Sequence, residues 1–369
     1  MTRRVVLVAN WMHDVGGVQT ATRALAGALR AAGYGVRVVS MLPSADRVVR
    51  EDVARTVQPV GPLHRILRRA LGARGGGTVP ARLDLPARIV AHVRLRTIAL
   101  SSDVLVAMDV YAAEAAARAG RGRVVVAQFH NSAQSLEGTR DLDRLREMRL
   151  RLSALVALTE ADRAVFEDWG FAPVVAIPNV VRPSAGAVAT GARERLVVAL
   201  GRFTDVKRFD LLIRAWRRLP DPIRATWRLE VRGGGPREAA LLQAAEGDGS
   251  VVVAGPTDDV AGLLARAQML VLPSEFEGLP MVLLEAMAAG AACVATRSSP
   301  GVEQLIDGAG WLVPVGDERG LTVALEQAIT DEAARVRAVR AADERIARYA
   351  PDAIAAQWTP LLDDGARSA

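Results

Sequence analysis

The sequence predicts an α/β protein with two domains, each built on a parallel sheet. The chain has 369 residues, half of them apolar, which suffices for two domains of ordinary size. Short apolar runs alternate with segments of helical spacing, an order typical of strand–helix–strand units in parallel sheets. The stretch 268–303 contains one such unit in full.

This unit also predicts where a ligand binds. The apolar run 269–272 is the expected strand, and Pro280 fits the first turn of the helix 281–289, where its missing N–H costs nothing. Gly290 is a natural residue to end that helix, and 292–295 is the next expected strand. The loop before the helix therefore lies at the carboxyl end of a parallel strand, where open α/β sheets bind ligands.

The first domain is expected at residues 1–184, and a linker rich in Ala and Gly follows at 185–193. The expected strands of this domain are 4–10, 36–40, 104–108, 124–129, 155–159 and 174–177. Its expected helices are 19–32, 112–119 and 161–169.

The second domain is expected at residues 194–346, and a terminal helix is expected within 347–369. The expected strands of this domain are 196–200, 227–231, 250–254, 269–272, 292–295 and 311–315. Its expected helices are 209–219, 281–289 and 318–346, with a shorter helix that begins at Pro300.

Cysteine usage and hydropathy limit the possible classes. Cys293 is the only cysteine, so an intrachain disulfide and a cysteine metal cluster are both excluded. No apolar run is long enough to span a membrane. The N-terminus passes from basic residues directly into a strand, without the length or cleavage site of a signal peptide. We therefore expect a cytoplasmic protein.

The formal charge of +6 is carried almost entirely by arginine, and Lys207 is the only lysine. No nucleic-acid-binding motif occurs, and basic patches with interleaved aromatic residues are absent from the sequence. We expect no nucleic-acid partner. A diphosphate donor, an anionic membrane surface or an acidic polymer suits the charge better.

Residues 62–71 have apolar side chains at helical spacing and basic side chains opposite, the pattern of a basic amphipathic helix. One interpretation is an ordinary core helix with a solvated basic face. The other is peripheral contact with an anionic membrane, at the inner face of the plasma membrane, or a groove for an acidic acceptor.

Two carboxylates frame the helix at 281–289: Glu277 precedes it and Glu285 lies within it, with seven residues between them. The helix N-terminus offers free N–H groups to an anion. A carboxylate accepts hydrogen bonds and so binds hydroxyl groups well. This combination suits a nucleotide-diphosphate sugar. The alternative is that Glu277 only complements the helix dipole and Glu285 is an ordinary surface residue.

The stretch 274–290, which reads SEFEGLPMVLLEAMAAG, resembles the signature of retaining family 4 glycosyltransferases of the GT-B fold (glycosyl transferases group 1), and weaker similarity extends over nearly the whole chain. The resemblance implies two Rossmann-like domains that face a cleft, with a C-terminal helix that crosses back to the first domain. It implies that Glu277 touches the donor sugar. The backbone of Gly278 and Leu279 would hold sugar and phosphate, and Glu285 would hold the ribose.

The same resemblance assigns roles to three side chains in other loops. It places Arg202 and Lys207 on the donor diphosphate. It places His130 against the donor sugar and the reaction centre. His130 also follows an expected strand directly, and this position puts it at the ligand-binding edge of the sheet.

Four glycines complete the expected donor site. The resemblance implies that the loop of Gly16 and Gly17 faces donor and acceptor, and that the loops at Gly233 and Gly255 surround the nucleotide base. A glycine pair also lets a backbone come close to a bound group. The alternative for Gly16 and Gly17 is a tight turn with no ligand.

The resemblance implies sugar transfer from a UDP- or GDP-sugar to an acceptor hydroxyl, with retention of the anomeric configuration. The expected catalytic residues are His130, Arg202, Lys207 and Glu277. The implied catalysis is electrostatic stabilisation of the departing diphosphate, and the resemblance implies neither a metal nor a cofactor. A cell-wall, lipid-linked or polysaccharide glycan is the expected acceptor, with a small secondary metabolite as the alternative.

Two other classes of function stay open at this stage. A nicotinamide-dependent oxidoreductase is also doubly wound, but the dinucleotide fingerprint G-x-G-x-x-G is missing from the first strand–helix turn. A non-catalytic nucleotide-sugar-binding protein would have a degenerate site, whereas the pairs Glu277/Glu285 and Arg202/Lys207 are intact.

Overall fold

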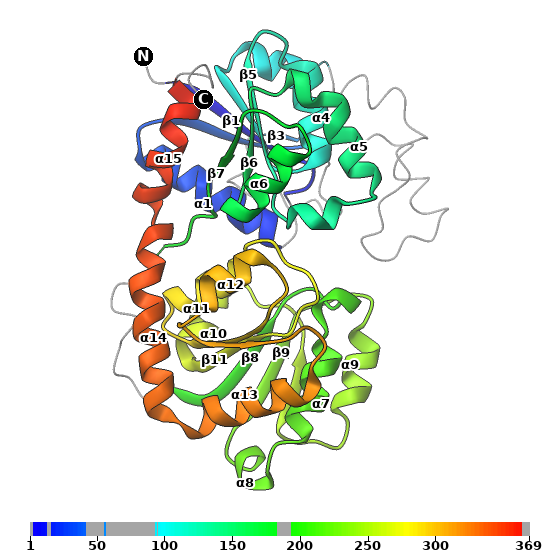
Figure 1. Cartoon of the computed structure of the whole chain (residues 1–369), viewed down its shortest axis with the longest axis vertical. Helices are drawn as coiled ribbons and strands as arrows, with labels where there is room; N and C mark the ends of the chain where they lie inside the picture. The colour runs from blue at the N-terminus through cyan, green and yellow to red at the C-terminus, as the bar shows by residue number, and fades with distance from the viewer. Residues whose placement is uncertain are drawn as a thin grey trace.

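The computed structural model describes residues 3–12, 16–41, 55–56, 93, 95–182 and 193–363. It consists of two α/β domains placed end to end, each with a parallel sheet, and it confirms the predicted fold class (Figure 1). The predicted basic helix at 62–71 and most of the predicted linker lie outside the described residues. Within the described part of the chain, none of the helices has the length and apolar character needed to cross a membrane.

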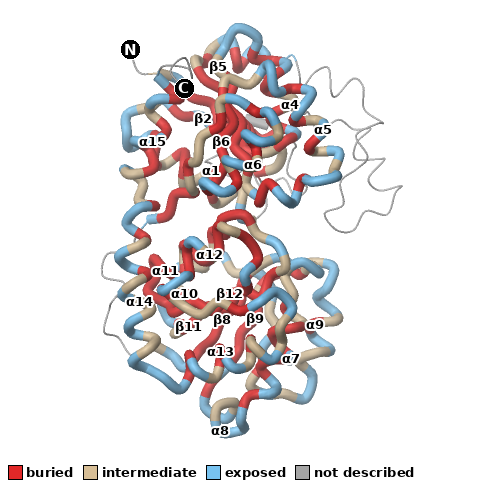
Figure 2. Tube along the Cα trace, in the orientation of Figure 1, coloured by how far each residue is buried: buried red, intermediate tan, exposed pale blue. Residues whose placement is uncertain are grey.

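In the first domain the described strands form one sheet in the order β3-β2-β1-β4-β5-β6-β7. The strands are β1 (Arg4–Ala9), β2 (Gly35–Ser40), β3 (Arg55–Thr56), β4 (Val104–Ala107), β5 (Val124–Gln128), β6 (Ala154–Ala157) and β7 (Val174–Ala176). The helices are α1 (Gly17–Ala31), α4 (Val110–Ala119), α5 (Arg140–Met148) and α6 (Glu160–Asp168). Helices cover both faces of the sheet, so β4 and β6 are buried along their whole length (Figure 2).

In the second domain the sheet order is β10-β9-β8-β11-β12-β13. The strands are β8 (Glu194–Leu200), β9 (Arg228–Arg232), β10 (Val251–Ala254), β11 (Ala267–Leu272), β12 (Ala292–Thr296) and β13 (Trp311–Val313). The helices are α7 (Phe209–Arg217), α8 (Asp221–Arg224), α9 (Glu238–Ala245), α10 (Val260–Arg266), α11 (Met281–Ala288), α12 (Pro300–Ile306), α13 (Glu318–Thr330) and α14 (Glu332–Ile346). The switch point of this sheet lies between β8 and β11, which are neighbours.

The run 318–346, predicted as one helix, is two helices that meet at Asp331. The Asp331 side chain accepts a hydrogen bond from the backbone N–H of Ala334 at 2.8 Å and so caps the start of α14. A short acidic side chain can replace helical hydrogen bonds in this way and so start a new helix. The prediction missed this break because the apolar spacing of 318–346 continues through Asp331 without interruption.

The last helix, α15 (Pro351–Asp363), returns to the first domain and packs against α1 (Figure 1). Trp358 is fully buried in the core that α15 shares with α1 and the sheet. The Tyr34 hydroxyl donates a hydrogen bond to the Asp363 carboxylate at 3.1 Å, and the Arg3 guanidinium donates one to the Leu362 carbonyl at 2.5 Å. The chain therefore begins and ends on the same domain, and α14 and α15 connect the two domains.

Candidate functional site

The two domains touch where the carboxyl ends of β5 and β11 face one another. A Cβ atom added at Gly278 would lie 2.2 Å from the carbonyl oxygen of His130 and 2.9 Å from the Cα of Asn131. Backbone atoms cannot swing aside as a side-chain tip can, so only glycine permits this approach. Gly278 and Leu279 are called the donor loop below, after the role that the sequence analysis expects of them.

The donor loop is also held from both domains by hydrogen bonds. The Asn179 amide nitrogen donates to the Leu279 carbonyl at 3.0 Å, across 100 positions of sequence. The Ser299 hydroxyl donates to the Gly278 carbonyl at 2.7 Å. Asn179 belongs to the first domain and Ser299 to the second, so the loop is tied to both.

His130 lies two residues beyond the end of β5, at the edge of the sheet that the sequence predicts for it. Its ring nitrogen Nε2 is buried and has no hydrogen-bond partner among the described residues. Burial lowers the pKa of the imidazole from 6.5 to about 4, although a hydrogen bond with the Asn179 side chain acts in the opposite direction. The imidazole is therefore neutral at physiological pH.

A buried carboxylate fixes the segment that follows His130. Asp162 accepts hydrogen bonds from the Ser132 hydroxyl at 3.0 Å, the Ala133 backbone N–H at 2.7 Å and the Thr159 hydroxyl at 2.7 Å. The sequence analysis missed this residue. The signal was present, because Thr159 and Asp162 have the spacing of a capping box at the start of α6.

Lys207 and Glu277 form an ion pair at 2.6 Å, with 24% and 10% of their side chains exposed. Lys207 follows β8 and Glu277 follows β11, so neighbouring strands bring the two predicted residues together. A second ion pair joins Arg208 to Glu275 at 2.5 Å. The sequence analysis did not identify this second pair. The two pairs fix the loops of β8 and β11 side by side.

Glu285 lies on α11, one turn beyond its start, and has no charged or hydrogen-bonding side-chain partner among the described residues. Burial raises the pKa of its carboxyl from 4.5 to about 7. None of the described residues gives it an ion pair or a hydrogen bond through the side chain. Its oxygens are thus available to a ligand that brings its own donors.

The remaining predicted residues differ in exposure and in their contacts with neighbouring loops. Gly233 approaches the loop after β8, because an added Cβ would lie 1.8 Å from the Gly201 carbonyl oxygen. Arg202 is exposed beside that contact. Gly255 is exposed, and a Cβ there would meet nothing within 4 Å.

Gly16 and Gly17 form the start of α1, a helix that packs against α11 of the second domain. An added Cβ at Gly16 would meet only the flexible side chain of Gln19, and one at Gly17 would meet nothing within 4 Å. The pair thus begins the helix that contacts the second domain, but packing does not require glycine at either position.

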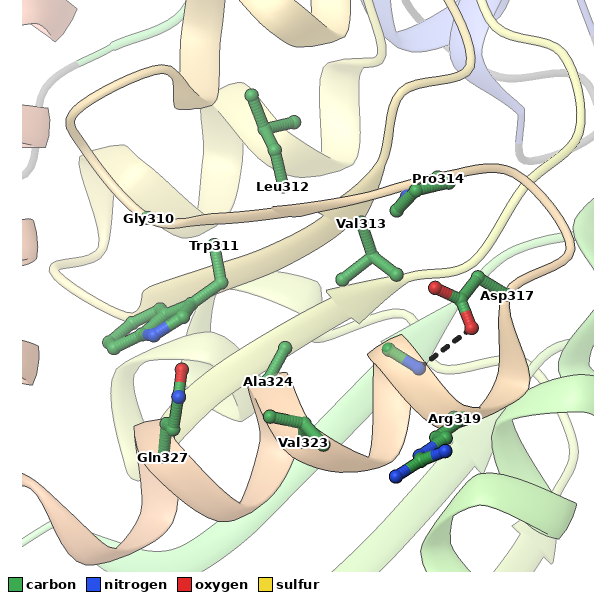
Figure 3. Close-up of a pocket in the computed structure, with 11 residues that line it drawn as sticks. Gly310, Trp311, Leu312, Val313, Pro314, Asp317, Arg319, Val323, Ala324 and Gln327 are labelled. Atoms are coloured by element: carbon green, nitrogen blue, oxygen red, sulfur yellow. Dashed lines mark hydrogen bonds between the residues drawn. The ribbon is translucent and has the colours of Figure 1, made fainter.

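A shallow hollow of about 520 Å³ lies elsewhere, between β13 and α13 (Figure 3). Trp311, Val323 and Gln327 are among the residues that line it, and none of the predicted site residues does so. In the part of the chain that the structure describes, no three His, Cys, Asp or Glu side chains are grouped as a metal site would require.

Two family models match the chain, one for each domain. The model described as Glycosyltransferase Family 4 matches residues 15–185, and the model described as Glycosyl transferases group 1 matches residues 194–331.

Individual proteins match over most of the chain. An exopolysaccharide phosphotransferase of Streptomyces coelicolor is 29% identical over 390 aligned residues, which cover 98% of this chain and 41% of that protein. A phosphatidyl-myo-inositol mannosyltransferase of Mycolicibacterium smegmatis is 29% identical over 96% of this chain and 92% of its own length. The chain spans less than half the length of several of the relatives it matches.

Among solved structures, HepE of Anabaena in complex with UDP-glucose superposes with a TM-score of 0.76 at 18% identity, over 98% of this chain and 99% of that one. The likeness shows that the two proteins share a fold, the GT-B fold of two facing α/β domains.

The contact at Gly278 generates a first prediction. Gly278→Ala forces a methyl group against the His130 carbonyl, so we expect the free energy of unfolding to fall by ~1–3 kcal/mol and the domains to separate. Urea denaturation and small-angle scattering measure the two effects. Gly255→Ala is the matched control, because its methyl group meets open space. Equal behaviour of the two variants would show that the contact does not hold the domains together.

Glu285 generates a second prediction, on the dependence of stability on pH. Its folded-state pKa of about 7 lies above the unfolded value of 4.5. The folded state therefore holds an extra proton between these values, and the stability this contributes is lost as pH rises through 7. Glu285→Gln lacks this loss, so its free energy of unfolding relative to wild type should increase from pH 5 to pH 8 in urea titrations.

Glu238→Gln, at an exposed position of α9, is the control for that experiment. A constant difference between Glu285→Gln and wild type across the range would contradict the half-buried, unpaired carboxyl.

Proposed function

This chain belongs to the glycosyl transferases of group 1 and family 4, and from that membership we propose that it moves a sugar from a nucleoside-diphosphate donor to an acceptor hydroxyl with retention of the anomeric configuration. The observation that carries the proposal is the Lys207–Glu277 ion pair beside the donor loop. It combines a cation for a diphosphate with an acceptor for sugar hydroxyls, at the place where the domains meet.

Positive charge for the departing diphosphate comes from three sources. Lys207 supplies a compact ammonium group, and the exposed Arg202 supplies a planar guanidinium that can bind two phosphate oxygens. The start of α11 adds free backbone N–H groups, because Pro280 occupies its N-cap and no side chain caps it. These groups are in place before the charge develops, which is the arrangement that stabilises a transition state best.

The sugar and ribose would be bound by acceptor groups. Glu277, paired with Lys207, would accept hydrogen bonds from hydroxyls of the transferred sugar. Glu285, unpaired in the part of the chain described, would accept both ribose hydroxyls and become ionised as it does so. His130 offers its unpartnered Nε2 to a further substrate hydroxyl.

Retention requires that the acceptor attack from the face that the diphosphate leaves. The bond from the anomeric carbon to the phosphate oxygen breaks, and the bond to the acceptor oxygen forms on the same side. The acceptor's proton passes to the departing phosphate oxygen. Glu277 is held in an ion pair rather than aimed as a free nucleophile, and this favours the direct route over a glycosyl-enzyme intermediate.

We propose a UDP-sugar as donor and a glycan of the cell wall or an exopolysaccharide as the end product. The donor follows the UDP-glucose bound to HepE, and the product class follows the relatives named for exopolysaccharide and phosphatidyl-myo-inositol. A panel of nucleotide sugars in a thermal-shift screen would identify the donor, and stabilisation by NADH instead would favour an oxidoreductase.

The solitary lysine gives the third prediction. Lys207→Arg keeps the charge but changes the shape of the cation, so we expect turnover with the identified donor to fall about 10- to 150-fold, the equivalent of one hydrogen bond to a charged group. Steady-state kinetics measure this. Arg195→Lys, an exchange at an exposed position of β8, is the matched control.

An amine-reactive reagent gives an independent test of the role of Lys207, because Lys207 and the terminal amine are the only primary amines in this sequence. Modification should abolish transfer, and saturating UDP should protect. Full modification of Lys207 with an unchanged rate would eliminate its diphosphate role.

A further inference from the structure

The hollow between β13 and α13 is formed by the edge strand of a sheet and one face of a helix (Figure 3). Arg319, Val323 and Gln327 are spaced four residues apart on α13, so their side chains lie on the same face of the helix. Another face of α13 packs into the core of the second domain. Across the hollow, β13 is the last strand of its sheet and contributes Trp311.

Trp311 gives the hollow a fixed aromatic surface. It is half-buried, because it packs against the core of the second domain and also lines the hollow. Figure 3 shows the Gln327 side chain rising from α13 toward this ring. A ring that the core already holds in place loses little conformational freedom when a ligand binds. The hollow therefore offers a preorganised apolar surface, which the exposed side chain of Val323 extends.

Three polar groups around this surface are unpaired. In the part of the chain that the structure describes, the Trp311 indole N–H, the Gln327 amide and the Arg319 guanidinium have neither a hydrogen-bond partner nor an ion-pair partner. The Gln327 amide can both donate and accept, whereas the other two groups only donate. A ligand in the hollow can therefore form several hydrogen bonds without displacing any bond of the protein.

The chemistry of the hollow distinguishes between classes of ligand. A phosphate group would favour a helix start with free N–H groups, but the Asp317 carboxylate accepts a hydrogen bond from the Gly320 N–H at 2.8 Å and so caps α13. A purely apolar ligand would cover Arg319 and Gln327 without giving them partners, which is costly. A saccharide has an apolar face of C–H groups and a rim of hydroxyl groups, and it complements both the ring and the polar groups.

We propose that the hollow is a non-catalytic binding site for a saccharide chain, which stacks on Trp311 and exchanges hydrogen bonds with Gln327 and Arg319. Its volume of about 520 Å³ lies within the range of ~300–1,000 Å³ that is usual for small-ligand sites. None of the residues proposed to bind the donor lines it. The saccharide chemistry follows from the hollow alone, and only the identity of the chain as acceptor or product of sugar transfer rests on the proposed function.

Isothermal titration of the full-length protein tests the proposal. The probes are maltoheptaose, chitohexaose and an oligogalacturonate, which represent neutral, N-acetylated and acidic chains. We expect wild type to bind at least one of them, and to bind it equally well with UDP present, because the hollow and the donor site have no residue in common. Binding of none of the three would overturn the proposal.

Substitutions in the hollow locate the bound chain. Gln327 is exposed, and Gln327→Ala should weaken binding about 2- to 12-fold, the equivalent of one neutral hydrogen bond. Trp311→Leu keeps apolar volume against the core but removes the flat ring, and it should weaken binding about 30-fold, as the loss of a tryptophan anchor does. Trp311→Phe keeps a ring and should retain most of the affinity.

Gln243→Ala removes an exposed amide on α9 and is the matched control for Gln327→Ala. Unchanged affinity in both Gln327→Ala and Trp311→Leu would place the saccharide outside the hollow and overturn the proposal.

Kinetics separate this inference from the proposed function. With the bound saccharide as acceptor, Gln327→Ala should raise the acceptor KM about 2- to 12-fold and leave hydrolysis of the donor by water unchanged, because water makes no use of the hollow. Absence of sugar transfer by wild type would remove the proposed function and leave the binding result intact. Sugar transfer by a wild type that binds no saccharide in the hollow would overturn this inference alone.

Discussion

The site depends on one contact between backbones, that of Gly278 with His130 and Asn131. It is possible only because Gly278 has no side chain, and it sets the spacing of the two domains at the carboxyl ends of β5 and β11. Asn179 of the first domain and Ser299 of the second then donate hydrogen bonds to the carbonyls of the donor loop. The contact therefore places residues of the first domain beside the loops of the second domain that are proposed to bind the donor.

The charges of the second domain are arranged around this contact in two different ways. Lys207 and Arg208 are each paired with a carboxylate that follows β11, so their loops are ordered without a ligand. Glu285 has no such partner, and burial raises the pKa of its carboxyl to about 7. A half-buried group with unused acceptors gains most from a ligand that donates hydrogen bonds. The paired groups order their loops, whereas the Glu285 carboxyl and the His130 Nε2 have no side-chain partner among the described residues.

The fold was readable from the sequence because the alternation of apolar runs and helical segments is local. Glu277, Gly278 and Glu285 were readable because a single loop and helix contain them. The hydrogen bond from Asn179 to Leu279 joins residues 100 positions apart, and no local pattern specifies it. The pairing of Arg208 with Glu275 depends in the same way on β8 and β11 being neighbours. The helix cap at Asp331, by contrast, is a local feature of the sequence. The prediction missed it because the continuous helical spacing of apolar residues favoured a single helix.

The central claim is that the facing loops transfer sugar with retention, and the anomer formed first tests it most directly. UDP-glucose, or the nucleotide sugar that stabilises the protein most, is incubated with enzyme and water as the acceptor. Time-resolved proton NMR then observes the sugar before mutarotation. The account predicts release of the α-anomer from an α-linked donor. The β-anomer as first product would contradict retention, and stability of every nucleotide sugar tested would contradict the assignment as a transferase.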